Sequence, residues 1–143
     1  MPRINFVRVF LGGIVAAIIL FIISGIVDGA ILGNQWRAWQ QSLGSTVHPP
    51  AVGTEMAVWA VFNLIIGITG VWIYAAIRPR YGAGPKTAMI AGFMVWVLTM
   101  LTAAIAHVAL GDLPPTNIVI IDLVTGLVRA QLAMLAGGAI YKE

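Results

Sequence analysis

Long runs of apolar residues divide the chain into four segments. Three of these runs, each 19 to 22 residues long, contain no charged side chain: residues 9–27, 56–77 and 87–106. A fourth run, residues 117–140, is interrupted only by Asp122 and Arg129. A helix needs about 20 apolar residues to cross a hydrocarbon core of about 30 Å. The pattern therefore predicts four transmembrane helices.

We expect one integral membrane domain, residues 1–143, that folds as an all-α transmembrane four-helix bundle with short loops. A sheet open to lipid would leave backbone groups unpaired, and the runs lack the alternation of a membrane barrel. The first run is longer than the apolar core of a signal peptide, so we take it as a retained span. The expected spans cover residues of about 9–32, 55–77, 87–110 and 117–140.

The composition excludes several other classes of protein. Of the 143 residues, 60% are hydrophobic and only 9% are charged, whereas a soluble domain is about 25% charged. The chain has no cysteine, which excludes disulfides, thiolate metal sites and iron–sulfur clusters. Eight basic residues against five acidic ones, spread as described below, do not form the stripe that nucleic acid requires.

Basic residues predict the orientation of the spans. Lys and Arg collect in the cytoplasmic loops of membrane proteins. The first of the two outer connections contains Arg37 as its only basic residue, and the second contains none. We therefore predict a bacterial inner-membrane protein with both termini in the cytoplasm. The basic residues assigned to the inner face are Arg3, Arg8, Arg78, Arg80, Lys86 and Lys142.

The connections carry local signals of their own. Residues 34–43 place tryptophans on one face and polar side chains on the other, which predicts a short amphipathic helix in the outer interface. Pro79 and the glycines after it predict that the second helix ends near Arg78. Thr116 or Asn117 is the predicted N-cap of the fourth helix.

The hairpin between the second and third spans carries a resemblance. Residues 74–88 read Y-A-A-I-R-P-R-Y-G-A-G-P-K-T-A. This segment resembles the central hairpin of a group of small, uncharacterised bacterial membrane proteins with four helices, and the similarity extends to the layout of the spans. The resemblance implies the same four-span fold and brings no function with it.

Small residues predict where the helices approach one another, because close packing drives helix association in lipid. Gly25, Gly29 and Gly33 form two overlapping GxxxG units on the first helix, and we predict that they form a helix-packing interface. The other spans also carry small residues at helical spacing, namely Gly67, Gly70, Ala88, Gly92, Ala103, Ala106, Gly126, Ala130, Ala133 and Gly137.

Ionisable residues within the spans are the candidate functional residues, because they are costly in lipid. Arg129 lies near the middle of the fourth helix, and Asp122 lies seven residues earlier, close to the same face. Side chains of a helix lean toward its N-terminus, so Arg129 should reach toward Asp122. We predict a polar seam, open to the outside, formed by Asp28, Glu55, Asn63, His107, Asp122 and Arg129.

Three interpretations of the seam remain open: an internal ion-pair network, a site for a ligand or ion, and a contact of Arg129 with a neighbouring subunit or lipid. His107 could also ligate a haem or chlorin, but a membrane b-type haem takes two histidines at one depth, and His48 in the first loop is a poor second ligand. We therefore predict a hydrogen-bonded histidine, no metal site and no cofactor.

The sequence leaves three functional hypotheses. The first is a non-catalytic structural or accessory subunit of a larger membrane complex, which contacts lipid, protein partners or further copies of itself. The alternative is a small carrier or channel that binds a cation or small solute in the seam. A membrane enzyme acting on a lipid or quinone would use Asp122, His107 or Glu55, but the chain has no recognised catalytic motif.

Overall fold

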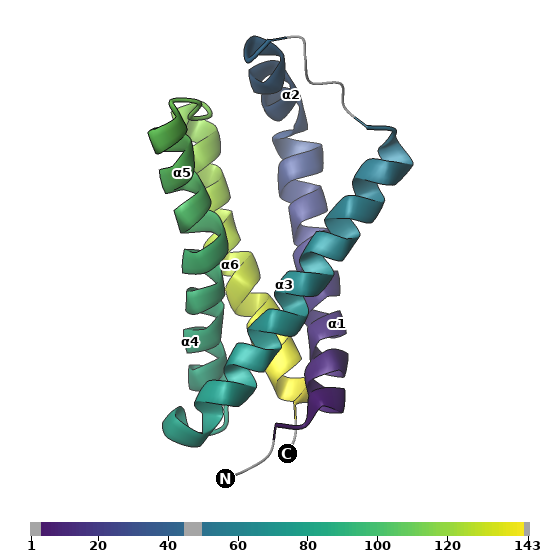
Figure 1. The fold of residues 1–143 in the computed structure, drawn as a ribbon, viewed down its shortest axis with the longest axis vertical. Helices are drawn as coiled ribbons and strands as arrows, with labels where there is room; N and C mark the ends of the chain where they lie inside the picture. The colour runs from purple at the N-terminus through teal and green to yellow at the C-terminus, as the bar shows by residue number, and fades with distance from the viewer. Residues whose placement is uncertain (1–3, 45–49, 142–143) are drawn as a thin grey trace.

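A computed structural model of the chain describes residues 4–44 and 50–141, and these residues form helices joined by short connections (Figure 1). Four helical stretches are long and apolar enough to cross a membrane, with bounds Phe6–Ile31, Val52–Tyr81, Pro85–Leu110 and Thr116–Ile140. The predicted all-α bundle with four spans is therefore confirmed. The elements in chain order are α1 (Phe6–Ser24), η1 (Gly25–Ile31), α2 (Gly33–Ser42), α3 (Val52–Tyr81), α4 (Pro85–Trp96), η2 (Val97–Leu101), α5 (Thr102–Leu110) and α6 (Thr116–Ile140), where η marks a π-helix.

Two helix ends differ in detail from the sequence prediction. Helix α3 continues through Pro79 to Tyr81 and ends at Gly82, whose φ of 86° few other residues adopt. Pro79 has no N–H, so the helix lacks one hydrogen bond there. The last turn still closes, because the N–H of Gly82 donates to the carbonyl oxygen of Arg78, 2.8 Å away. Helix α6 begins at Thr116, but Pro115 takes the cap position and offers no side-chain hydrogen bond.

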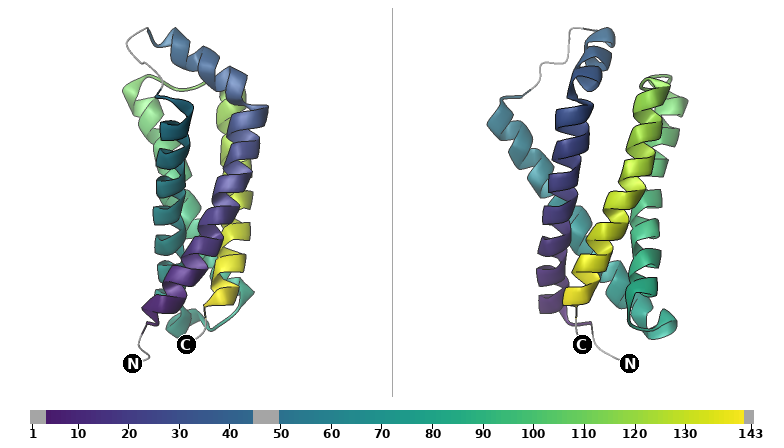
Figure 2. Two further views of the ribbon diagram at one scale, coloured as in Figure 1. Left: turned by 90° about the vertical axis from the view of Figure 1, so that its right-hand side faces the viewer. Right: turned by 180° about the vertical axis from the view of Figure 1, so that it is seen from behind.

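The short helix predicted over residues 34–43 is present as α2. Its Gln35 accepts a hydrogen bond from Asn117 Nδ2, 2.5 Å away, so α2 is tied to the outer end of α6. A small cluster of buried apolar side chains lies beside this tie: Val27, Leu32 and Ile118. One hydrogen bond and this cluster thus tie the outer end of the first span to α6. Helix α2 lies at the end of the bundle opposite the two chain ends (Figure 2).

Glycines bring the helices into close contact in the half of the bundle that holds both ends of the described chain. We call this the inner half and the opposite one the outer half, after the predicted orientation. A Cβ added at Gly13 would lie 2.6 Å from Cα of Ile68, and one added at Gly12 would lie 2.5 Å from the carbonyl oxygen of Gly137. Helix α1 therefore crosses α3 and α6 with the backbones nearly touching. We call this contact, at Gly12, Gly13, Gly67 and Gly137, the glycine crossing. Gly67 also lies directly against the backbone of α1. A Cβ at Gly92 would lie 3.0 Å from the carbonyl oxygen of Ala130, and one at Gly70 or Gly126 would meet the side chain of a methionine.

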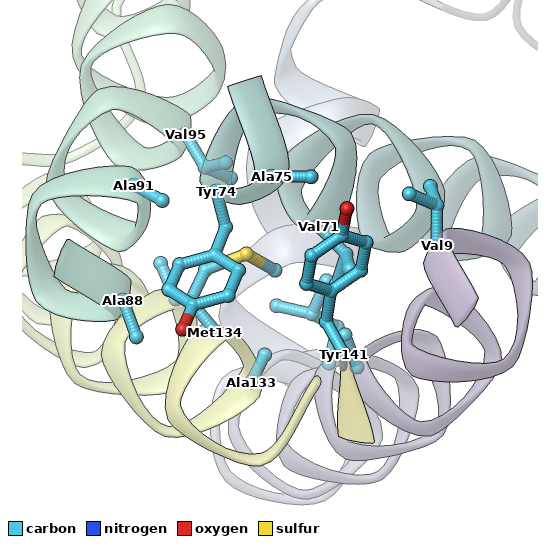
Figure 3. Close-up of a cluster of buried hydrophobic side chains, with 13 residues drawn as sticks. Val9, Val71, Tyr74, Ala75, Ala88, Ala91, Val95, Ala133, Met134 and Tyr141 are labelled. Atoms are coloured by element: carbon cyan, nitrogen blue, oxygen red, sulfur yellow. The ribbon is translucent and has the colours of Figure 1, made fainter. Parts of the chain in front are cut away.

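The main core lies next to this crossing (Figure 3). Tyr74 and Tyr141 stack edge to face with their ring centroids 6.0 Å apart, among Val71 and Met134. The hydroxyl oxygen of Tyr141 accepts from the N–H of Asn5, 3.2 Å away, and that of Tyr74 accepts from the N–H of Gly84 at the same distance. The start of α1, the central hairpin and the end of α6 are therefore joined at the inner end.

The outer half of the bundle is much less packed. Every residue of α3 from 52 to 62 is exposed, and α5 contains no buried residue. In Figure 1, α3 runs obliquely across the molecule, and its outer end stands away from α5 and α6. The bundle is closed in its inner half and opens toward the outer side.

The predicted GxxxG interface does not pack within the chain. A Cβ at Gly25 or Gly29 would meet nothing within 4 Å. One at Gly33 would meet only atoms of the same segment, the carbonyl oxygen of Asp28 at 3.6 Å and the guanidinium of Arg37 at 3.9 Å. Ala103 and Ala106 are also exposed. These small residues lie in the outer half, where the helices separate, so they hold no helix of this chain.

Candidate functional site

The site is built around Arg129, near the middle of α6. This side chain is almost wholly buried, with 3% of the residue exposed. Its NH1 donates to Asp28 Oδ2 at 2.7 Å, and its NH2 donates to Asp122 Oδ1 at 3.0 Å. One guanidinium thus joins the first span to the fourth and bridges two carboxylates (the Asp28–Arg129–Asp122 triad). Such charge-assisted bonds are about twice as strong as neutral ones.

Helix geometry accounts for one of these two pairs. Asp122 and Arg129 are seven residues apart on α6, so the two side chains lie nearly above one another, as the sequence predicts. Thr125 lies between them and turns its hydroxyl to the carbonyl oxygen of Ile121, 2.6 Å away, so it does not compete for the guanidinium.

Asp28 reaches the site from a π-helix. It lies in η1, where each turn holds one more residue than an α-helix, so the direction of the side chains after Gly25 differs from that of a regular helix. Single π turns are often found at functional sites. The wider turn is how the structure brings Asp28 to face Arg129.

A second π-helix supplies a contact that the sequence did not suggest. Met100 lies in η2 of the third span, and its Sδ accepts from Arg129 NH2 at 3.0 Å. The same side chain fills the space beside Gly126, where a Cβ would lie 3.0 Å from the sulfur. The sequence does not indicate that Met100 accepts a hydrogen bond from Arg129, because methionine side chains usually fill space in a core.

The triad has more negative charge than positive charge. Two carboxylates face one guanidinium, and Asp28 Oδ1 and Arg129 Nε are buried without a hydrogen-bond partner. The carboxylate side chains stay 30% exposed at Asp28 and 26% exposed at Asp122. Both lie inside helices long enough to span the membrane. Hydrocarbon cannot solvate this charge, so the exposed carboxylate surface requires a polar cover.

Glu55 and Asn63 do not join the triad. Glu55 lies in the exposed first turn of α3. Asn63 is buried, but its Nδ2 donates to the carbonyl oxygen of Trp59, one turn earlier, at 2.8 Å. The oblique course of α3 explains both positions, because its outer half leaves the bundle above the glycine crossing. The continuous seam of six residues is therefore reduced to a triad.

His107 lies apart from Arg129, near the outer end of α5. Its Nδ1 is 3.0 Å from Asp112 Oδ1, and its ring meets that of Trp39 edge to face at 5.8 Å. These contacts connect α5 to the outer turn and to α2. Among the described residues there is no group of three His, Asp or Glu side chains suited to a metal ion, and His48 lies outside the described residues.

Comparison with known proteins adds no candidate function. No protein-family model, no curated protein and no solved structure matches the chain. The functional argument therefore depends on the geometry of the bundle and of the triad.

Proposed function

We propose that the protein is a non-catalytic accessory subunit of a larger bacterial membrane complex, and that its outer half packs against a transmembrane segment of a partner. The observation that carries this proposal is the exposed carboxylate surface of the triad, at the level where the bundle is open. A partner side chain with an N–H or O–H donor, or with a positive charge, would cover that surface and balance the extra carboxylate.

The unpacked helices support the same interpretation. Residues 52–62 of α3 are all exposed, and no residue of α5 is fully buried within the chain. Gly25 and Gly29 present a small-residue face with open space in front of it. Small residues allow another helix to approach closely, and close packing is what holds helices together in lipid. The outer half thus offers both a packing surface and a charge to be matched.

The size and chemistry of the chain agree with an accessory role. Almost the whole described chain lies in the four spans and α2, which leaves little mass outside the membrane for a catalytic domain. The hairpin between α3 and α4 contains Arg78, Arg80 and Lys86 and is called the basic hairpin. Its positive charge, together with the carboxylates near the opposite ends of the spans, predicts an inner membrane location with cytoplasmic termini.

A small carrier is the second candidate, and one observation favours it. Asp28 Oδ1 is buried without a donor, and an unpaired carboxylate oxygen is a suitable place for a cation or a solute donor. Water would then cover the exposed carboxylates in place of a protein. A carrier also needs a path through the inner half, and the glycine crossing and the main core close that half tightly.

Site-specific photo-crosslinking in the native host tests the proposal. A photoreactive amino acid at Met56, in the open outer half of α3, is expected to capture a defined membrane partner. The matched control is Phe10 in the inner half of α1, which is equally exposed to lipid, 52% against 55% for Met56. Cross-links at Met56 alone would support the proposal. Equal capture at both sites, or adducts with lipid only, would overturn it.

A further inference from the structure

A groove in the inner half of the molecule has no role in the accessory interface. It is shallow and widely open, is formed mainly by α4 with Gln131 of α6 at its side, and measures about 540 Å³. Its lining is apolar along most of its length, and Met89 and Phe93 are half exposed within it. The lining residues are Pro85, Lys86, Met89, Ile90, Phe93 and Gln131. Such a groove in a transmembrane surface is open to the acyl chains of the bilayer.

One end of the groove is charged. Lys86 stands in the first turn of α4, directly after the basic hairpin that contains Arg80. The carboxylates of the described chain, Asp28, Glu55, Asp112 and Asp122, all lie toward the outer side, and none of them lines the groove. A negative group at Lys86 would therefore meet no nearby repulsion from the described residues.

The distances along α4 suit a lipid. Lys86 and Phe93 are seven residues apart, which is about 10 Å along a helix. The phosphate of a lipid at the membrane surface can therefore contact Lys86. The part of the same lipid's acyl chain nearest the headgroup can then lie along Met89 and Phe93. Pro85 has no N–H, so only the N–H groups of Lys86 and Thr87 in the first turn of α4 lack a carbonyl partner one turn earlier, and they add a positive potential at the same end.

We propose that this groove binds an anionic phospholipid of the inner leaflet, with the phosphate at Lys86 and one acyl chain along α4. The occupant is the lipid itself, because the groove combines an apolar wall at membrane depth with a single positive charge at its surface end. The site is independent of the accessory interface, which lies in the outer half.

Native mass spectrometry of the detergent-purified full chain tests charge selectivity. We expect more bound phosphatidylglycerol than phosphatidylcholine when the two lipids carry the same acyl chains. Lys86→Gln should weaken phosphatidylglycerol binding about fivefold, since a basic residue at the surface contributes about 1 kcal/mol. Arg80→Gln removes the same charge nearby but outside the groove, so its effect should be less than twofold. Lys86→Arg should retain binding.

A photoreactive phosphatidylglycerol with a diazirine on its acyl chain tests the location. We expect the label on residues 85–93. Equal binding of the two lipids, equal losses in Lys86→Gln and Arg80→Gln, or a label elsewhere would overturn the proposal. If the groove holds a second copy of the chain instead, residues 85–93 should stay unlabelled and the protein should appear as a dimer. Thermal unfolding of each variant shows whether a loss reflects misfolding.

Discussion

Arg129 links the first, third and fourth spans through three contacts. Its guanidinium binds Asp28, Asp122 and the sulfur of Met100. A central arginine costs about 2.5 to 3.5 kcal/mol when a helix inserts, so α6 needs these partners. A buried ion pair can be replaced as a whole at little cost, but removal of one partner leaves a charge uncompensated and costs about 3 to 5 kcal/mol.

Arg129→Leu is therefore expected to destabilise the protein by about 3 to 5 kcal/mol, because it leaves two carboxylates within the spans. Unfolding in detergent and the level of accumulation in the membrane measure the effect. Arg37→Leu is the matched control, since Arg37 is exposed in α2 and, within residues 4–44 and 50–141, its one hydrogen bond is to Asn34. An Arg129→Leu protein that unfolds with the wild type would contradict the structural role of the triad.

Neutralising the whole triad separates stability from function. The triple variant Asp28→Asn, Asp122→Asn, Arg129→Met removes all three charges, so it is expected to regain most of the stability that Arg129→Leu loses. If the carboxylates also recruit the partner, the triple variant should accumulate normally but fail to cross-link from Met56. A triple variant as unstable as Arg129→Leu would show that charge imbalance is not the cause.

The sequence predicted part of this site. Asp122 and Arg129 lie on one helix at a spacing that brings their side chains together, so their pairing does not depend on how the other helices pack. The sequence included Asp28 in the polar seam, but the direct pairing of Asp28 with Arg129 and the contact of Met100 depend on two π-helices, which no residue pattern indicates. Glu55 and Asn63 have the spacing of residues on one face of α3, which predicted that both face the interior. Spacing along the chain cannot show that the outer half of α3 leaves the bundle.

At the scale of helices, the glycine crossing determines how the spans pack. Gly67 lies against the backbone of Gly13 and Ala17, and α1 and α3 have no room for a side chain between them. The helices themselves were predictable from the lengths of the apolar runs. Which glycines touch was not, because every span carries small residues at helical spacing. Gly13 and Gly67 pack, whereas Gly25 and Gly29 do not.

Gly67→Ala and Gly29→Ala form a matched pair that tests the crossing. The added methyl group at Gly67 would lie 2.7 Å from the backbone nitrogen of Ala17, so we expect destabilisation of about 1 to 3 kcal/mol. At Gly29 it meets open space, and alanine favours the helix by up to about 1 kcal/mol. Unfolding in detergent measures both. Equal effects of the two substitutions would contradict the crossing.

At the scale of the whole molecule, the charges and the packing are both uneven along the length of the bundle. The inner half has the core, the glycine crossing and the basic hairpin, whereas the outer half has the carboxylates and the exposed helices. Charge counting predicted the first asymmetry. The second appears only when the spans are placed in space, because α3 is as apolar at residues 52–62 as many helices that pack.

The topology prediction has a direct test, because the chain contains no cysteine. Ser42→Cys lies at the end of α2, and Ala83→Cys lies in the exposed central hairpin. We expect a membrane-impermeant maleimide to label Ser42→Cys in cells with an opened outer membrane, and to label Ala83→Cys only after the inner membrane is permeabilised. The reverse pattern would place the basic hairpin outside and contradict the orientation.

The accessory proposal is tested most directly by mild-detergent purification of the tagged protein from its own host, followed by mass spectrometry of the intact assembly. We predict a stoichiometric membrane partner that is lost when Met56 and Trp59 on the open half of α3 are replaced by charged residues. Phe10 variants on the packed half should keep it. A chain that purifies alone, as a monomer or as copies of itself, would contradict the proposal and make a solute site at Asp28 the leading explanation.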